Sequence, residues 1–319
     1  MDETFRPVFG PVPSRRLGQS LGIDPVRPKT CNWNCVYCQL GRSAPLIAER
    51  KEYVSAEEII ATLKAVLQKA RPGSIDWITF VGSGETTLNS RLGWMIRQVK
   101  QITDLPVAVI TNGSLLYRQD VREELAAADA VLPTLDAGTP ELYRKINRPW
   151  PEPTYEQYLQ GLIDFRRMYR GKYWLEIMLV KGMNDTEEAL HDLAAQILRI
   201  APDKVHLTLP DRPAAEPWVK PPDEEGIMRA LAILGKSGVE VVHPRRGSFD
   251  ISAYTNPTEA ILAILARHPM RDDEIIATLH RWAPEQAREA LETLRRSGKV
   301  QIVERYGVRF WALAGGKYA

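Results

Sequence analysis

The stretch Thr30-Cys31-Asn32-Trp33-Asn34-Cys35-Val36-Tyr37-Cys38 contains all three cysteines of a chain of 319 residues. Their spacing is Cys-x3-Cys-x2-Cys, and the two asparagines between them are typical of a loop. An odd number of cysteines on one loop argues against a disulfide framework. Three thiols so close together indicate a site that binds a metal or a cluster through sulfur.

Around this loop, from about residue 20 to residue 247, short β-rich apolar runs alternate with amphipathic helical patterns. Repeated β-then-α units predict a parallel sheet with right-handed crossovers. Six or seven such units are too few for a closed eight-fold barrel and predict a partial one. The predicted strands are Leu21–Asp24, Trp77–Gly82, Val107–Thr111, Ala130–Leu135, Trp174–Val180, Val205–Leu209 and Val239–Val242.

Two helix starts can be read directly from the sequence. Ser55 precedes Glu58 by three residues, which is a capping-box pattern. Asp185-Thr186-Glu187-Glu188 has the polar and acidic character of a second helix start. In a parallel sheet the loops that do chemistry lie at the carboxyl ends of the strands. The cysteine loop follows the first predicted strand, so it lies where the active site is expected.

After Asn256-Pro257 the pattern changes. Three short helices are predicted at Thr258–His268, Asp272–His280 and Pro284–Ser297, followed by a hairpin of Lys299–Arg305 and Val308–Leu313. Three helices followed by a hairpin describe a winged helix. We therefore predict two domains, residues 1–255 and residues 256–319.

The bulk composition excludes several classes of protein. The net charge is +2, from 42 basic and 40 acidic residues, so the chain is not strongly polybasic. The N-terminus lacks the apolar core of a signal peptide, and no apolar run approaches the ~18 residues of a membrane-spanning helix. We expect a cytoplasmic protein without a membrane partner, in a reducing compartment where thiols stay free.

Three interpretations of the cysteine loop can be compared. Buried cysteines acting as small hydrophobes would be expected on strands and helices. A structural zinc ion needs four ligands, and none of the five histidines is near this loop. A cubane iron–sulfur cluster normally takes one thiolate per iron. Three thiolates leave one iron open to a small molecule, which explains the absence of a fourth cysteine.

With this motif the sequence resembles the radical S-adenosylmethionine superfamily, whose hallmark is Cys-x3-Cys-x2-Cys after the first strand, with an aromatic residue, here Tyr37, before the last cysteine. The resemblance implies a partial (β/α)6 TIM-like barrel and a [4Fe-4S] cluster on Cys31, Cys35 and Cys38. It also implies that S-adenosylmethionine binds the open iron and that an external flavodoxin- or ferredoxin-type donor supplies an electron. The products would be methionine and a 5′-deoxyadenosyl radical that abstracts hydrogen from the substrate.

The resemblance also implies cofactor contacts at the strand ends. Phe80-Val81-Gly82-Ser83-Gly84-Glu85-Thr86 looks like the family's glycine-rich segment for the amino group of S-adenosylmethionine. Asn112 and Asp136 follow the third and fourth predicted strands, where a helix-cap role is an equal alternative. Lys181 and Leu209 resemble the adenine-contacting edge. The predicted cofactor-binding residues are Tyr37, Gly82, Ser83, Gly84, Glu85, Asn112, Asp136, Lys181 and Leu209.

Basic residues gather on the loops of the predicted active edge and favour an anionic substrate. The candidates are Arg15, Arg16, Lys29, Arg144, Arg148 and Arg212, with Arg42, Lys145, Arg245 and Arg246 nearby. Residues 10–18 and 29–42 further resemble a branch related to the wyosine-tRNA synthases. Since those enzymes use a second cluster on additional cysteines, we do not expect their pyruvate-condensing reaction here.

Three functions remain open at this point. The first is a radical enzyme acting on an anionic small molecule or nucleotide. The second is a tRNA- or RNA-modifying enzyme of the same family. The third is an iron–sulfur redox sensor that binds DNA through the winged helix. The C-terminal domain could bind nucleic acid or a protein, or form a lid on the barrel, because basic and acidic residues alternate along it.

Overall fold

The computed structural model describes residues 5–318 except 236–237, 243–248, 252–253 and 255. In this part of the chain the larger sheet has eight strands in the order β1 to β8. They are β1 (Val8–Ser14), β2 (Gly18–Ile23), β3 (Trp77–Phe80), β4 (Val107–Thr111), β5 (Ala130–Pro133), β6 (Lys172–Met178), β7 (Lys204–Thr208) and β8 (Val239–Val241). β1 is antiparallel to β2, and β2 through β8 are parallel.

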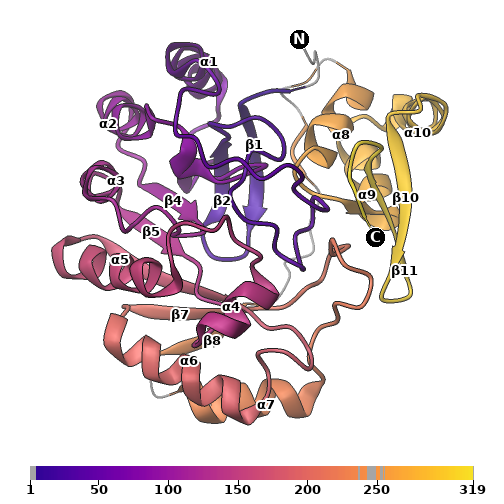
Figure 1. The fold of residues 1–319 in the computed structure, drawn as a ribbon. Helices are drawn as coiled ribbons and strands as arrows, with labels where there is room; N and C mark the ends of the chain where they lie inside the picture. Colours follow the sequence, from indigo (N-terminus) through magenta and orange to yellow (C-terminus); the bar gives the residue numbers. More distant parts are fainter. Residues whose placement is uncertain (1–4, 236–237, 243–248, 252–253, 255, 319) are drawn as a thin grey trace.

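Helices connect the parallel strands and lie along the outer side of the curved sheet (Figure 1). The helices on the outer side are α1 (Ala56–Lys69), α2 (Leu92–Ile102), α3 (Gln119–Leu125), α5 (Tyr155–Met168), α6 (Glu187–Ile200) and α7 (Glu224–Leu234). The short helix α4 (Pro140–Ile146) lies nearer the middle of Figure 1, where Ile146 packs against Val36 of the cysteine loop, and a 3-10 turn, η1, is at Thr86–Leu88. The predicted partial barrel is confirmed, and all seven predicted strands are present. The sheet has seven parallel strands, one more than a strict (β/α)6 count.

Local sequence explains where the helices begin. Ser55 Oγ accepts a hydrogen bond from Glu58 N at 3.2 Å, while Ala56 N donates to the Glu52 carboxylate at 2.7 Å. Thr186 caps α6 by accepting from Ala189 N at 3.3 Å. Both predicted helix starts are therefore correct, since short polar side chains satisfy the unpaired amides of a first turn.

Strand β1 was not predicted, because Gly10, Pro11 and Pro13 interrupt its pattern. It is an edge strand with a register shift between Phe9 and Val12. Proline is tolerated at such positions because it cannot donate to a ladder. The β1–β2 turn brings Leu17 into a small apolar cluster with Ala108, Ala130 and Leu132 of β4 and β5.

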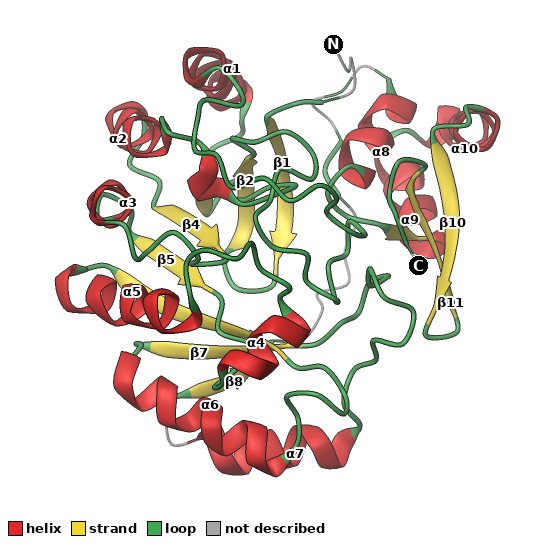
Figure 2. Cartoon of the chain, viewed as in Figure 1, coloured by secondary structure: helices red, strands yellow, loops and turns green. Residues whose placement is uncertain are grey.

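The C-terminal part has α8 (Pro257–Leu265), β9 (Met270–Arg271), α9 (Asp272–Trp282), the 3-10 turn η3 (Pro284–Gln286), α10 (Ala287–Arg296), β10 (Val300–Arg305) and β11 (Val308–Leu313). Figure 2 shows these helices beside a small sheet of β10, β11 and β9. The three helices and the hairpin occur where the sequence predicted them. β9, which pairs with β11, was not predicted, because it has two residues.

A separate apolar cluster holds this C-terminal part together and includes Phe249, Ile251 and Trp311, with Val12 of β1 packed against it. The packing of the C-terminal part therefore begins before residue 256, in the segment that leads out of the barrel.

None of the helices in the described residues combines the length and the hydrophobicity needed to cross a bilayer.

His206 on β7 gives the barrel an acid-sensitive group. Its side chain is buried and packs edge-on against Trp174. Burial and the nearby positive charge of Arg16 lower the pKa of His206 to about 4. The unfolded chain takes up this proton near pH 6.5 but the folded chain does not, so stability falls as the pH falls through that window.

When the pH is lowered from 7 to 5, we expect the free energy of unfolding of wild type to fall by about 2 kcal/mol more than that of His206→Gln. Urea unfolding of both proteins at the two pH values measures the difference. The comparison with the variant removes the contribution of carboxylates that both proteins share. An equal pH dependence of the two proteins would contradict the assigned neutral state of His206.

Candidate active site

The cysteine loop and the glycine segment form one unit at the carboxyl ends of β2 and β3. Lys29 N donates to the Ser83 carbonyl at 2.7 Å, and Glu85 N donates to the Thr30 carbonyl at 2.9 Å. A Cβ at Gly84 would overlap the Thr30 carbonyl oxygen, and one at Gly82 would overlap the Asp24 carboxylate. Glycine is required at both positions so that the two loops can lie against each other.

Each cysteine sulfur has a nitrogen donor beside it. Cys31 Sγ accepts from Trp33 N at 3.4 Å, with Asn112 Nδ2 at 4.0 Å. Asn147 Nδ2 lies 3.7 Å from Cys35 Sγ, and Lys29 Nζ lies 3.8 Å from Cys38 Sγ. Donors to sulfur stabilise the thiolate, which is the form that binds metal.

In the absence of a bound metal or cluster, burial disfavours the charged thiolate and so keeps the thiols protonated. It raises the pKa of Cys31 to about 12, with Glu85 adding to the shift, and it raises the pKa of Cys35 well above its usual value. A metal or cluster that binds here must displace these protons, so its affinity should rise with pH.

Among the described residues, no three or more His, Cys, Asp or Glu side chains are grouped closely enough to hold one metal ion. The thiolates of a cubane each bind a different iron, so they need not converge on a point. Three thiols along one wall of a cavity, each with a nitrogen donor, fit such a cluster.

That cavity has a volume of about 710 Å³, and all three cysteines line it. It also brings together many of the other predicted residues, namely Arg15, Arg16, Lys29, Tyr37, Gly82, Ser83, Gly84 and Arg212. Ser20, Thr79, Met178 and Thr208 form further walls inside the barrel. The volume is in the range of small-molecule and cofactor sites.

Two predicted cofactor contacts have a different position from the one expected. The buried Glu85 carboxylate accepts from Thr111 Oγ1 at 2.6 Å and from Asn112 N at 2.7 Å, so it ties β3 to β4. The Asn112 amide donates to Asn32 Oδ1 at 2.9 Å and so supports the cysteine loop. Both side chains lie behind the cavity wall rather than on it.

Asp136 also lies one layer behind the cavity. It accepts from Tyr37 Oη at 2.5 Å, from Asn147 Nδ2 at 2.7 Å and from Met178 N at 2.8 Å. Burial raises its pKa to about 6. Its direct role is therefore to hold Tyr37, which lines the cavity.

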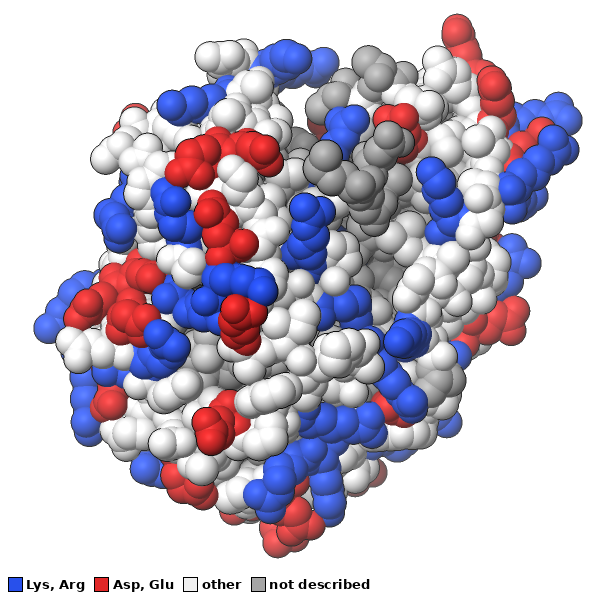
Figure 3. Space-filling view, turned by 45° about the horizontal axis from the view of Figure 1, so that its top comes forward, with Lys and Arg blue, Asp and Glu red and all other residues white. Residues whose placement is uncertain are grey.

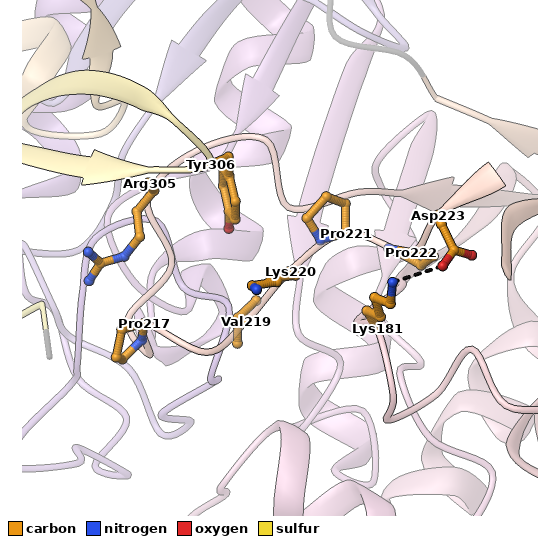
Figure 4. A pocket seen from close by; sticks show the side chains of 9 residues that line it. All are labelled: Lys181, Pro217, Val219, Lys220, Pro221, Pro222, Asp223, Arg305 and Tyr306. Carbon is orange, nitrogen blue, oxygen red and sulfur yellow. Dashed lines mark hydrogen bonds and ion pairs between the residues drawn. The ribbon is translucent and has the colours of Figure 1, made fainter.

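The remaining predicted residues lie outside this cavity. Leu209 packs against the main apolar core, and Arg144 is exposed on α4. Arg148 is paired with Glu216. Lys181 pairs with Asp223 at 2.8 Å in a separate pocket of about 270 Å³, which Figure 4 shows between the barrel loops and Tyr306 of the hairpin turn. Arg245 and Arg246 fall outside the described residues.

Three of the four arginines that line the cavity are each paired with a carboxylate. Arg15 pairs with Asp211 at 2.5 Å, Arg16 pairs with Glu176, and Arg212 pairs with Glu274 at 3.1 Å. In total five basic and three acidic side chains line the cavity. The cavity lining therefore has a net positive charge, but this charge is smaller than a count of the arginines alone would give.

A lid on the barrel was one of the alternatives for the C-terminal part, but the sequence did not identify the residues of that part that complete the cavity. Phe249, His268, Arg271 and Glu274 line it. Burial lowers the pKa of His268 to about 3, so this ring is neutral, and it lies 3.4 Å from Gln39 Nε2. These residues are more than 200 positions from the cysteines along the chain, and no local pattern links the two segments.

A family model described as "Radical SAM superfamily" matches residues 27–194, just over half of the chain. The chain belongs to the radical SAM superfamily. It is thus an enzyme, and enzymes of this superfamily use a [4Fe-4S] cluster and S-adenosylmethionine.

Known proteins resemble this radical SAM enzyme over most of its length. It is 40% identical to a protein named GTPase Obg of Brachyspira hyodysenteriae over 92% of this chain but 43% of that protein. It is 38% identical to a UPF0026 protein of Methanocaldococcus jannaschii, over 86% of each. A structure of TYW1 with a lysine-pyruvate adduct shares the fold, with a TM-score of 0.53 and 19% identity over 69% of this chain and 74% of that one.

We expect Gly84→Ala to damage this radical SAM site. The new methyl group must push Thr30 and the adjoining Cys31 away from the glycine segment, which should cost about 1–3 kcal/mol and lower cluster content. Gly235→Ala is the control, because nothing lies within 4 Å of a Cβ at that position. Urea unfolding and iron analysis test both variants. Equal stability and equal iron content of the two variants would contradict a close contact between Gly84 and Thr30.

Proposed function

We propose that Cys31, Cys35 and Cys38 hold the [4Fe-4S] cluster and that S-adenosylmethionine binds beside it against Gly82–Gly84. The observation that carries this proposal is that the cysteines and the glycine segment open into one cavity. When bound, the cluster and S-adenosylmethionine supply reductive cleavage of the C5′–S bond and a radical that abstracts hydrogen from the substrate.

The protein's own residues orient the cofactor and exclude water from it. Tyr37 is fixed by Asp136, and Ser83 is fixed by Asp24, which accepts from Ser83 N at 3.0 Å and from Ser83 Oγ at 2.8 Å. Trp33, Tyr143 and Tyr158 pack with centroids 5.0–5.6 Å apart beneath the cysteine loop. Lys29 places a positive charge beside Cys38, which offsets the charge of bound thiolate.

We further propose a substrate with an anionic group, either a small molecule or a nucleotide. A guanidinium has five N–H donors, so an arginine already paired with one carboxylate can still bind a second anion. Buried Arg16 Nε has no hydrogen-bond partner among the described residues, and Arg16 lines the cavity. This donor supports binding of an anionic group inside the barrel.

Modification of tRNA or another RNA is the second candidate, in a branch related to the wyosine-tRNA synthases. The fold shared with TYW1 is consistent with that branch. Family membership favours either enzyme over an iron–sulfur regulator. We place the activity in the cytoplasm, where thiols stay reduced.

For the C-terminal part we propose a winged-helix-like domain that serves as a wall of the active site, with nucleic-acid or protein binding as an added role of its outer surface. Tyr318 Oη donates to the Gln39 carbonyl at 2.8 Å, and Arg42 N donates to the Lys317 carbonyl at 2.8 Å. Residues 317 and 318 thus lie against the segment that directly follows Cys38.

The test is anaerobic reconstitution followed by addition of dithionite and S-adenosylmethionine. We expect release of 5′-deoxyadenosine, and deuterium transfer from candidate anionic substrates into it identifies the substrate. No 5′-deoxyadenosine after confirmed cluster loading would contradict the proposed function.

A further inference from the structure

The outer face of the cysteine loop is covered by a thin layer of chain. Trp150 N donates to the Asn32 carbonyl at 2.7 Å, and Asn34 N donates to the Arg148 carbonyl at 3.2 Å. From the other side, Glu216 N donates to the Val36 carbonyl at 3.0 Å. The segments 148–150 and 216–218 therefore lie directly against the backbone of the cysteine loop, and the side chains of Arg148, Trp150 and Trp218 reach solvent.

This covering layer is basic. The buried Glu216 carboxylate binds two arginines, Arg42 through Nε at 3.0 Å and Nη2 at 2.9 Å, and Arg148. Because one carboxylate faces two guanidinium groups, a net positive charge remains. Helix α4, which leads into Arg148, adds exposed Arg144 and exposed Lys145, and Lys145 pairs with Glu141 of the same helix at 2.7 Å. Figure 3 shows lysine and arginine side chains gathered on the lower part of one face of the molecule.

Two large aromatic side chains flank these charges. Trp150 is 40% exposed and Trp218 is 46% exposed. Tryptophan and arginine are the residue types most enriched at the energetic centres of protein interfaces. We call the surface of Arg42, Arg144, Lys145, Arg148, Trp150 and Trp218 the outer basic face.

We propose that the outer basic face is the docking site of an acidic one-electron carrier protein of the flavodoxin or ferredoxin class. The inference rests on the proposed function, because it assigns to Cys31, Cys35 and Cys38 the group that receives the electron. In that step the carrier loses one electron and is oxidised, the group on the cysteines gains it, and no bond forms or breaks.

The position of the outer basic face favours this partner over a nucleic acid. None of its six residues lines the cavity that holds the cysteines. A nucleic-acid substrate bound there would be separated from the reaction chamber by the cysteine loop. An electron carrier needs only a close approach to that loop from outside. Complementary charge speeds such an encounter, and weak redox complexes need little buried area.

The experiment compares two reductants on one enzyme. Arg144→Glu with Lys145→Glu reverses charge on the outer basic face, and Lys64→Glu with Arg71→Glu makes the same change at exposed positions on and just after α1. The readouts are 5′-deoxyadenosine formation with reduced flavodoxin or with dithionite, and affinity for oxidised flavodoxin by fluorescence polarisation.

We expect the first variant to lose about ten-fold in the flavodoxin-driven rate and in affinity at low salt. Its dithionite-driven rate should stay within about two-fold of wild type, since a small reductant needs no docking surface. The control variant should resemble wild type with both reductants.

Equal loss with both reductants would overturn the proposal by showing damage to the active site. An unchanged flavodoxin-driven rate and unchanged flavodoxin affinity of the Arg144→Glu, Lys145→Glu variant would also overturn it. If that variant then failed to retain RNA that wild type binds, the outer basic face would be assigned to nucleic acid. If wild type releases no 5′-deoxyadenosine with dithionite after cluster loading, the proposed function itself fails. The polarisation measurement still reports on docking in that event.

Discussion

Replacing Cys35 with alanine is expected to reduce 5′-deoxyadenosine formation to the background of the assay and to remove most of the bound iron. The reason is the number of ligands: a cubane that already lacks a fourth thiolate would keep two of its three protein ligands. Iron analysis after reconstitution and the dithionite-driven reaction measure the two losses.

The fold should survive this substitution. Alanine fits the space of the Cys35 side chain, so we expect a change in stability of about 1 kcal/mol, which urea unfolding of the cluster-free proteins can measure. Cys31→Ala and Cys38→Ala should behave in the same way. A Cys35→Ala protein with full iron content and normal cleavage would remove Cys35 from the ligand set, and zinc in place of iron in wild type would favour a structural metal site.

Much of the fold could be predicted because it depends on local patterns. The β-rich runs and helical periodicities gave the parallel strands, and the polar starts at Ser55 and Thr186 placed two helices correctly. β1 was missed because Pro11 and Pro13 are unfavourable in a strand, and only its edge position tolerates them.

The candidate site was predicted less completely. Sequence places a residue at a strand end, but it does not say which way the side chain points. Glu85 and Asp136 were expected to contact a cofactor, yet each accepts hydrogen bonds from neighbouring protein groups behind the cavity. Arg144 and Arg148 belong to the correct edge of the sheet but lie outside the cavity. Partners such as Asp24 and Arg267, 243 positions apart, meet only in the folded chain.

Arg267→Met is expected to destabilise the protein by about 3–5 kcal/mol. Arg267 Nε donates to Asp24 Oδ2 at 2.9 Å, and the side chains of the pair are 2% and 0% exposed. Without the guanidinium, the Asp24 carboxylate stays buried beside Ser83 with no compensating charge. Because Ser83 belongs to the glycine segment, weaker binding of S-adenosylmethionine should accompany the loss.

The exposed pair of Arg309 and Asp272, with side chains 54% and 36% exposed, is the matched control. Arg309→Met should cost less than about 1 kcal/mol. In a double-mutant cycle, Asp24→Asn with Arg267→Met should cost less than the sum of the two single changes, because the neutral amide needs no counter-charge. Additive costs would show that the two side chains act independently.

The pH dependence gives the same pair a signature that simple loss of packing would not produce. Burial raises the pKa of Asp24 and Arg267 opposes that shift, so removing Arg267 raises the pKa further. A raised folded-state pKa favours folding at low pH, where the carboxyl is protonated, and this advantage disappears as the pH rises through the folded-state value. The deficit of Arg267→Met relative to wild type should therefore be smaller at pH 5 than at pH 8. A deficit that does not change with pH would indicate a cavity effect instead of an unpaired charge.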